Sequence, residues 1–283
     1  MVQDLPEKCV PEVCEKVWQL SQEPYHQFYP IFESEEDVRS TLSWTMEGYG
    51  SRAYGYWRAR VLEGVCCLFV EEEKHYVLII ALYSWGKFSA AANAFMRQIE
   101  KEFPGYTLEA GIAGEHTRFA QKLTRSGFQL QDERYDMRFA LGEAGNLPEL
   151  MEEDLVVLEG DPLGNYSALH DAWFPDCGWS AEDLDRVKDC WIVATARRGD
   201  ETRGAIFVVL FPGHASVYGF RAENQAMANA LVGAAIKRCA ARTNYQGMVR
   251  SMVKLTDETQ MRAMIEAGFA KTAHYTFYQR KAQ

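Results

Sequence analysis

The sequence lacks long apolar runs and a surplus of basic residues, and both absences exclude classes of protein. No stretch approaches the roughly 18 consecutive apolar residues of a membrane-spanning helix, and residues 1–18 show no basic-then-apolar leader. Acidic residues outnumber basic ones by 40 to 30, so the formal net charge is −10 and a nucleic-acid backbone would be repelled. A local basic pocket for a small anionic ligand stays compatible with that charge. We expect a cytoplasmic protein that spans no membrane and binds no nucleic acid.

The seven cysteines form no pattern that points to a metal or to disulfides. Their number is odd, and the sequence has no Cys-x-x-Cys pair and no Cys/His cluster. Cys66 and Cys67 are neighbours in a predicted strand, so their side chains point to opposite faces, and buried thiols are the simplest interpretation. We expect reduced cysteines, no disulfide framework and no metal site.

A linker divides the chain into two halves that repeat one another. Residues 141–154 contain two glycines, a proline and an acidic cluster, and they interrupt the periodicity on both sides. The first half has a strand followed by a helix over 75–103, and the second half has the same pair over 214–241. Each pair is followed by a strand, a helix, a Gly-Phe dipeptide and a last strand. Such internal similarity indicates that one structural unit occurs twice.

The Gly-Phe dipeptides mark the end of the last helix in each half. They are Gly127-Phe128 and Gly268-Phe269. Glycine suits the left-handed exit of a helix, and the phenylalanine then returns to the core. Upstream, short β-branched and aromatic runs with tight connections predict antiparallel hairpins. Two helices are predicted ahead of the hairpins in each half, over 6–21, 34–48, 163–174 and 180–189.

This order of elements predicts an α+β fold, because strands form a meander before the helices begin to alternate with them. Each half would form a mixed, mostly antiparallel twisted sheet flanked by helices. We place the domains at residues 1–145 and 152–283.

The same order resembles the GNAT superfamily of acyl-CoA-dependent N-acyltransferases over nearly the whole chain. In that family the fourth strand ends in a short loop, and a Gln/Arg-x-x-Gly-x-Gly/Ala turn then opens a helix. Here Phe220 would end the strand and residues 221–224 would form the loop. The matching turn comprises Gln225, Ala226, Met227, Ala228, Asn229 and Ala230.

The resemblance implies that this turn binds the pyrophosphate of coenzyme A, with acetyl-CoA as the expected cofactor. A helix N-terminus offers unpaired N–H donors and the positive end of the helix dipole. Ala228 stands at the first glycine of the family pattern, as Ala90 does in the first half, and a Cβ there narrows the approach of a phosphate. Packing is the alternative interpretation, since Met227 and Leu231 fall on one helical face.

Proton transfer is less clearly assigned than cofactor binding. Acyl transfer to an amine needs a base for the ammonium and an acid for the leaving thiolate. The resemblance implies a tyrosine acid four residues before each Gly-Phe, but Leu123 and Met264 stand there. Glu223 is a candidate base, Tyr275 a candidate acid and Ser251 a candidate lining residue near the thioester. A solvated loop carboxylate and a packed strand tyrosine are the alternatives for the first two.

The acceptor would bind at the first two helices of the second half and their loop, since these shape the acceptor site in the family. Residues 165–180 are rich in aromatics and contain Asp171 and Asp176. An acidic, aromatic mouth would suit a cationic amine, whereas packing of the helix pair would also explain the aromatics.

We therefore expect an acyl-CoA-dependent N-acyltransferase in the second half, with a degenerate copy in the first. The acceptor would be a small-molecule or peptide amine, and a homodimer is left open. The main alternative is a catalytically inactive GNAT-like ligand-binding or scaffold protein, which the two missing tyrosines favour. An aminoacyl or other acyl-group transferase built on paired domains is a third hypothesis.

Overall fold

The structure is a computed structural model in which the chain forms two compact units. One unit consists of Met1–Glu133 and His274–Gln283, and the other of Arg134–Ala273. The described residues are 1–48, 50–146, 155–159, 164–175, 180–186, 190–198, 200–211, 213–242 and 247–282.

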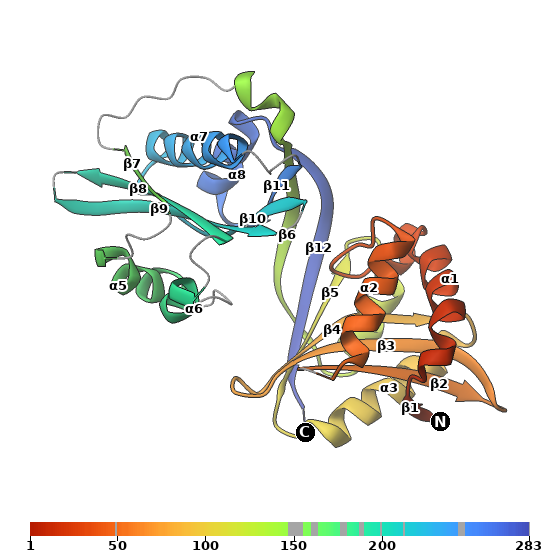
Figure 1. Ribbon diagram of the computed structural model, residues 1–283. Helices are drawn as coiled ribbons and strands as arrows, with labels where there is room; N and C mark the ends of the chain where they lie inside the picture. Colours follow the sequence, from red (N-terminus) through yellow and green to blue (C-terminus); the bar gives the residue numbers. More distant parts are fainter. Residues whose placement is uncertain are drawn as a thin grey trace. The chain divides into compact units, whose positions relative to one another are not determined.

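The first unit is a mixed sheet with helices on both faces (Figure 1). Its strands lie in the order β1-β2-β3-β4-β5-β12. Helices α1 and α2 pack together on one face, and α3 covers the other. The bounds are β1 Val2–Asp4, α1 Val10–Ser21, α2 Glu35–Met46, β2 Ser51–Arg58, β3 Val61–Glu71, β4 Tyr76–Ser84, α3 Phe88–Glu102, β5 Thr107–Ala113, α4 Thr117–Arg125 and β12 Ala270–Lys281.

The second unit repeats this architecture, with strands in the order β6-β11-β10-β9-β8-β7. Helices α7 and α8 cover one face of the sheet, and α5 and α6 lie on the other (Figure 1). The bounds are β6 Gln129–Ala140, β7 Leu155–Glu159, α5 Gly164–Trp173, α6 Ala181–Arg186, β8 Trp191–Arg198, β9 Glu201–Phe211, β10 His214–Arg221, α7 Gln225–Ala241, β11 Met248–Lys254 and α8 Glu258–Glu266.

The last strands of the two halves are exchanged between the units. Strand β12, from the end of the chain, pairs antiparallel with β5, whereas β6, from the first half, pairs antiparallel with β11. The units therefore do not coincide with residues 1–145 and 152–283. Both last strands follow a Gly-Phe exit and have similar patterns, so the sequence does not say which of them each fifth strand takes as its partner.

Local signals in the sequence account for most element boundaries. Ser34 caps α2 with a capping box, in which its side chain accepts the Asp37 N–H. Gly127 and Gly268 have φ of +82° and +94°, as the predicted left-handed helix exits require. Phe128 and Phe269 are buried, so each chain segment re-enters a core directly after its helix.

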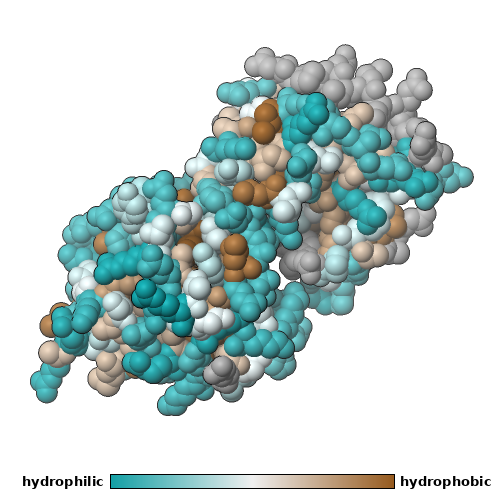
Figure 2. Space-filling view, turned by 180° about the vertical axis from the view of Figure 1, so that it is seen from behind, coloured by the Kyte–Doolittle hydropathy of each residue, from teal (hydrophilic) through white to brown (hydrophobic). Residues whose placement is uncertain are grey.

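Few large apolar side chains are exposed among the described residues. Most of the face in Figure 2 is hydrophilic, with apolar residues singly or in small groups. Within the described part of the chain, the exposed large hydrophobic residues come from different elements: Met1, Tyr25, Trp44, Val61, Leu130, Tyr218 and Ile265. Scattered residues of this kind are ordinary in folded proteins.

No helix in the described part of the chain combines the length and apolar character needed to cross a membrane.

Candidate functional site

The parallel strand pair at the centre of each sheet separates part-way along. In the second unit, β10 and β11 pair from His214↔Met248 to Val217↔Ser251, although both strands continue further. The register of β10 against β9 shifts between Val217 and Gly219, which makes Tyr218 the extra residue of a β-bulge. In the first unit the pairing of β4 with β5 ends at Ile79↔Ala110, and β4 also has a register shift. Both units thus carry a bulged strand that leaves its parallel neighbour.

In the first unit, the chain itself occupies the edge of β5 that β4 leaves. Phe28 forms an antiparallel bridge with Ile112, and the Tyr29 N–H donates to the Gly111 carbonyl at 2.9 Å. The Ala113 N–H donates to the Gln27 carbonyl at 3.0 Å. The Phe28 ring is fully buried. The segment Gln27–Tyr29 therefore satisfies backbone groups that a ligand lying between these strands would need.

In the second unit, the β10–α7 turn leaves two helix amides without an acceptor. The Asn224 side chain caps α7 and accepts the Met227 N–H at 2.9 Å. The Ala228 N–H bonds to the Asn224 carbonyl. Among the described residues, the N–H groups of Gln225 and Ala226 have no hydrogen-bond partner. These two donors, at the positive end of a long helix, can bind an anion.

Several residues of the predicted phosphate turn have a packing role instead. Met227 and Ala228 are buried in the core beneath α7 and α8, and Ala230 is buried as well. Asn229 ties α7 to α8, because it accepts from Gln225 Nε2 at 2.8 Å and donates to Glu266 at 2.6 Å. Phe220 is half-buried and packs against the same core. Because the Ala228 methyl group is in the core, the position of the missing glycine is not at the surface of the turn.

The three residues that the sequence suggested for chemistry have different environments. Glu223 is exposed and forms an ion pair with Arg203 at 3.7 Å, next to the helix amides. Ser251 is buried and accepts from Gln260 Nε2 of α8 at 3.2 Å. Tyr275 belongs to the first unit because β12 is exchanged, and its hydroxyl accepts the Ile31 N–H at 3.2 Å. The expectation that Tyr275 lies in the same domain as the α7 turn is thus corrected.

The positions of the missing tyrosines are core positions in both units. Leu123 and Met264 are 1% and 0% exposed. Neither can donate a proton, and neither side chain reaches solvent.

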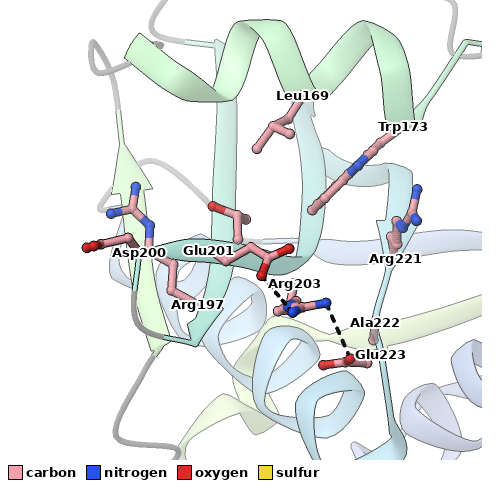
Figure 3. Close-up of a pocket in the computed structure, with 10 residues that line it drawn as sticks. Leu169, Trp173, Arg197, Asp200, Glu201, Arg203, Arg221, Ala222 and Glu223 are labelled. Atoms are coloured by element: carbon pink, nitrogen blue, oxygen red, sulfur yellow. Dashed lines mark ion pairs between the residues drawn. The ribbon is translucent and has the colours of Figure 1, made fainter.

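A pocket of about 830 Å³ lies in the second unit, beside the β10–α7 turn. Its walls are α5, the β8–β9 hairpin and the end of β10 (Figure 3). Leu169 and Trp173 point from α5 toward the strands, and the charged side chains belong to the strands beneath the helix. The lining residues are Leu169, Trp173, Arg197, Asp200, Glu201, Thr202, Arg203, Arg221, Ala222 and Glu223.

The described lining of this pocket contains both arginines and carboxylates. Arg203 bridges Glu201 at 2.6 Å and Glu223 at 3.7 Å (Figure 3). The Arg221 guanidinium lies 4.8 Å from the centre of the Trp173 ring, a cation–π arrangement. The Nε atoms of Arg197 and Arg203 are buried without a hydrogen-bond partner among the described residues. Buried donors without partners are unusual in folded proteins and point to a ligand or to water.

The expected acidic mouth of the acceptor site is only partly described. The Asp171 carboxylate accepts the Ala181 N–H at 2.8 Å and so joins α5 to the start of α6. Asp176 and Trp179 lie outside the described residues. Phe174 packs directly over Gly219, where a side chain on the strand would collide with its ring. The aromatic residues at this end of α5 therefore have both a packing role and, in Trp173, a pocket-lining role.

Sequence reasoning missed the arginines of the pocket. Arg197 and Arg203 flank a hairpin tip, and Arg221 ends the neighbouring strand, where it pairs with Ala205 of β9. Charged residues at the ends of strands predicted to be adjacent were the available signal. Predicting that these arginines line one pocket requires the strand register and the position of α5, and the sequence alone supplies neither.

Solved structures share this fold over most of the chain. A tandem GNAT protein from the clavulanic acid biosynthesis pathway is 12% identical, with a TM-score of 0.62 and coverage of 100% of this chain and 99% of that one. A GCN5-related N-acetyltransferase from Sphaerobacter thermophilus is 13% identical, with a TM-score of 0.69 and coverage of 100% and 96%. One from Kribbella flavida is 11% identical, with a TM-score of 0.55 and coverage of 77% and 88%.

No protein-family model matches the sequence, and no curated protein matches it. At these identities the likeness to solved structures concerns the fold. It confirms the α+β class and the two GNAT-like folds in tandem that the resemblance implied.

Proposed function

We propose that this chain, with its tandem GNAT fold, is an acyl-CoA-dependent N-acyltransferase whose coenzyme A site is the β10–α7 turn of the second unit. The proposal is supported by the backbone N–H groups of Gln225 and Ala226, which have no acceptor within the described part of the chain and lie next to a strand pair that separates. In the first unit, Gln27–Tyr29 pairs along β5, so the chain itself occupies the strand edge that a ligand would need.

The residues of the turn fit a phosphate. The Gln225 and Ala226 N–H groups would hold its oxygens, and the dipole of α7 adds favourable electrostatics. Ala226 is exposed and small, whereas the Ala228 methyl is buried and so does not narrow the approach. Bound acyl-CoA would supply the thioester, and its acyl group, which we propose to be acetyl, would pass to an amine and leave coenzyme A as the free thiol.

Proton transfer in this proposal relies on solvent and on the pocket carboxylates. Glu223 is the carboxylate nearest along the chain to the phosphate-binding amides, and its ion pair with Arg203 holds it at the pocket wall. It would accept the proton of the acceptor ammonium through water, because the pantetheine arm separates the thioester from the phosphate-binding amides. Met264 occupies the position of the family's acid, so water would protonate the leaving thiolate.

A calorimetric titration with acetyl-CoA tests the cofactor site. Ala226→Glu puts a carboxylate at the second residue of α7, where it favours the helix but repels a phosphate. Ala226→Gln is the matched control, with similar size and no charge. We expect wild type and Ala226→Gln to bind alike and Ala226→Glu to bind roughly tenfold or more weakly. Equal binding by all three proteins, or none by wild type at millimolar ligand, would reject the site.

A ligand-binding protein without catalysis is the second candidate function. The buried Leu123 and Met264 at both acid positions favour it. Thiol release from acetyl-CoA in the presence of amines separates the two, because a binding protein would take up acetyl-CoA without releasing coenzyme A faster than the uncatalysed reaction.

The compartment is also a proposal, and we place the protein in the cytoplasm. The cysteines among the described residues are free thiols, and four of them are buried: Cys14, Cys66, Cys67 and Cys239. Burial raises the pKa of Cys239 to about 12, so that thiol stays protonated and unreactive at neutral pH. Free thiols of this kind agree with a reducing compartment.

A further inference from the structure

We propose that the arginine-lined pocket beneath α5 is a second phosphate subsite of the acyl-donor site, and that it binds the 3′-phosphorylated adenosine end of coenzyme A. The inference rests on the proposed function and deepens it, because it makes the nucleotide part of the donor a determinant of binding. Coenzyme A carries its pyrophosphate and its 3′-phosphate on the same ribose, so a pyrophosphate at the α7 amides keeps the other phosphate nearby. The thioester, at the far end of the pantetheine arm, takes no part in this recognition.

The packing of β9 against α7 brings the pocket next to the helix amides. A Cβ on Gly204 would come within 2.6 Å of the Met227 sulfur and 2.9 Å of the Arg221 carbonyl oxygen, so β9 approaches this turn as closely as a glycine permits. Arg203 precedes that glycine and forms an ion pair at 3.7 Å with Glu223, in the loop that leads into α7. Pocket arginines therefore lie beside the start of the helix.

The pocket contains guanidinium donors that its own carboxylates do not satisfy. The Nε atoms of Arg197 and Arg203 are buried and have no hydrogen-bond partner among the described residues. Within that part of the chain, Arg197 and Arg221 form no ion pair, and the Arg221 guanidinium lies over the face of Trp173. A guanidinium can donate two parallel hydrogen bonds to a phosphate. These donors are therefore open to a phosphate that enters the pocket.

The ion pairs of Arg203 show how a phosphate would be accommodated. Glu201 contacts Arg203 at 2.6 Å, whereas the exposed Glu223 contacts it at the longer distance of 3.7 Å (Figure 3). A phosphate that approaches Arg203 would compete with the longer ion pair, and the Glu223 carboxylate would turn to solvent. Glu223 thus opposes an anionic ligand that the arginines attract, so substitutions on the two sides should have effects of opposite sign.

The size and the apolar wall of the pocket suit the adenosine that carries the phosphate. Its volume of about 830 Å³ is typical of sites for small molecules. Leu169 and Trp173 point from α5 toward the strands (Figure 3). An indole ring is a surface on which a purine base can stack. The pocket therefore combines donors for a phosphate with an aromatic surface for a base.

Calorimetric titrations with coenzyme A, dephospho-coenzyme A and adenosine 3′,5′-bisphosphate test the proposal. Dephospho-coenzyme A keeps the pyrophosphate and lacks the 3′-phosphate, so it should bind wild type roughly tenfold or more weakly than coenzyme A does. The bisphosphate lacks the pantetheine arm and should still bind. Equal affinities for coenzyme A and dephospho-coenzyme A would overturn the proposal.

Variants assign this preference to the pocket. The double substitution of Arg197→Gln and Arg221→Gln should reduce the preference for coenzyme A over dephospho-coenzyme A to within about twofold of equality. Lys237→Gln, which removes an exposed cation of α7 outside the pocket, is the matched control and should keep the preference of wild type. Glu223→Gln should strengthen the binding of coenzyme A. A double variant that retains the full preference would overturn the proposal.

The same titrations distinguish failure of this inference from failure of the proposed function. If acetyl-CoA binds without turnover, the transferase is wrong, and the comparison of coenzyme A with dephospho-coenzyme A still tests the pocket. If acetyl-CoA does not bind but the bisphosphate does, and the double variant weakens it, the pocket is supported without the α7 site. Bisphosphate binding that the double variant leaves unchanged overturns this inference alone. If neither ligand binds wild type at millimolar concentration, both proposals are overturned.

Discussion

Two buried polar residues, His116 and Asp136, are expected to affect the free energy of unfolding. His116 precedes α4 in the first unit and is 1% exposed. Both ring nitrogens lack a hydrogen-bond partner among the described residues, and the ring packs against Phe28 and Phe119. Burial, with a smaller effect of His26, lowers the pKa of His116 to about 3. The folded state therefore holds this imidazole neutral.

We predict that His116 makes the fold sensitive to mild acid. The unfolded imidazole takes up a proton below about pH 6.5, whereas the folded one does so only near pH 3. Stability contributed by the neutral ring is thus present above about pH 6.5 and falls by up to about 1.4 kcal/mol per pH unit below it. Urea denaturation at pH 7.5, 6.0 and 5.0 measures this, and His116→Phe should reduce the slope.

The control for this prediction is His75→Asn, which changes an exposed histidine in a turn. It should keep the slope of wild type. An identical pH dependence in His116→Phe and wild type would contradict the assignment.

Asp136 is the second residue with a strong expected effect. It is fully buried, and its Oδ2 atom accepts from Arg138 at 2.8 Å and Arg250 at 2.9 Å. We predict that Asp136→Asn lowers the free energy of unfolding by about 3–5 kcal/mol, because it removes the buried negative charge that both guanidinium groups contact. Urea denaturation measures the change, with the exposed Glu258→Gln as control. A loss as small as that of the control would show that this ion-pair cluster contributes little.

Among helices and strands, the sequence predicted the individual elements better than the pairing between strands. The helix at 225–241, the Gly-Phe exits and the hairpins all follow from local patterns, and each is present. The exchange of β6 and β12 was not predictable, because both strands fit either fifth strand equally well by pattern. The same limit applies to Gln27–Tyr29, which pairs with β5 although no periodicity marks it as a strand.

The strand exchange predicts which unit a substitution at the end of the chain will weaken. Tyr275 is fully buried, packs on Tyr29 at 5.1 Å between ring centres and pairs with Ala113 of β5. Tyr275→Ala should cost about 3–5 kcal/mol, as large-to-small core substitutions do. Hydrogen exchange followed by mass spectrometry should then show faster exchange in β5 than in wild type and little change in β11.

Phe269→Ala is the matched substitution in the core of the second unit, where Phe269 packs with Phe139. It should accelerate exchange in β11 instead. If Tyr275→Ala affected β11 and spared β5, the domains would follow the sequence halves, and the exchange would be wrong.

At the scale of the whole molecule, one fold occurs twice, and the described residues of the two copies differ beside the bulged strand. In the first copy, Gln27–Tyr29 pairs with the edge of β5, and in the second copy a charged pocket lies beside the start of α7. The net charge of −10 did not reveal the pocket arginines, since an average over 283 residues hides a local cluster. The element order sufficed for the fold, while the pocket required side chains from α5, β8, β9 and β10 to be placed together.

We propose that the second unit binds the acyl donor at the start of α7 and that the first unit does not. Hydrogen exchange of the full chain with and without acetyl-CoA distinguishes the two units, because peptides covering residues 221–230 and 84–92 report on the two equivalent turns separately. We expect slower exchange over 221–230 with acetyl-CoA and no change over 84–92. Protection over 84–92, or none over 221–230 at saturating acetyl-CoA, would show that the donor site is assigned to the wrong unit or does not exist.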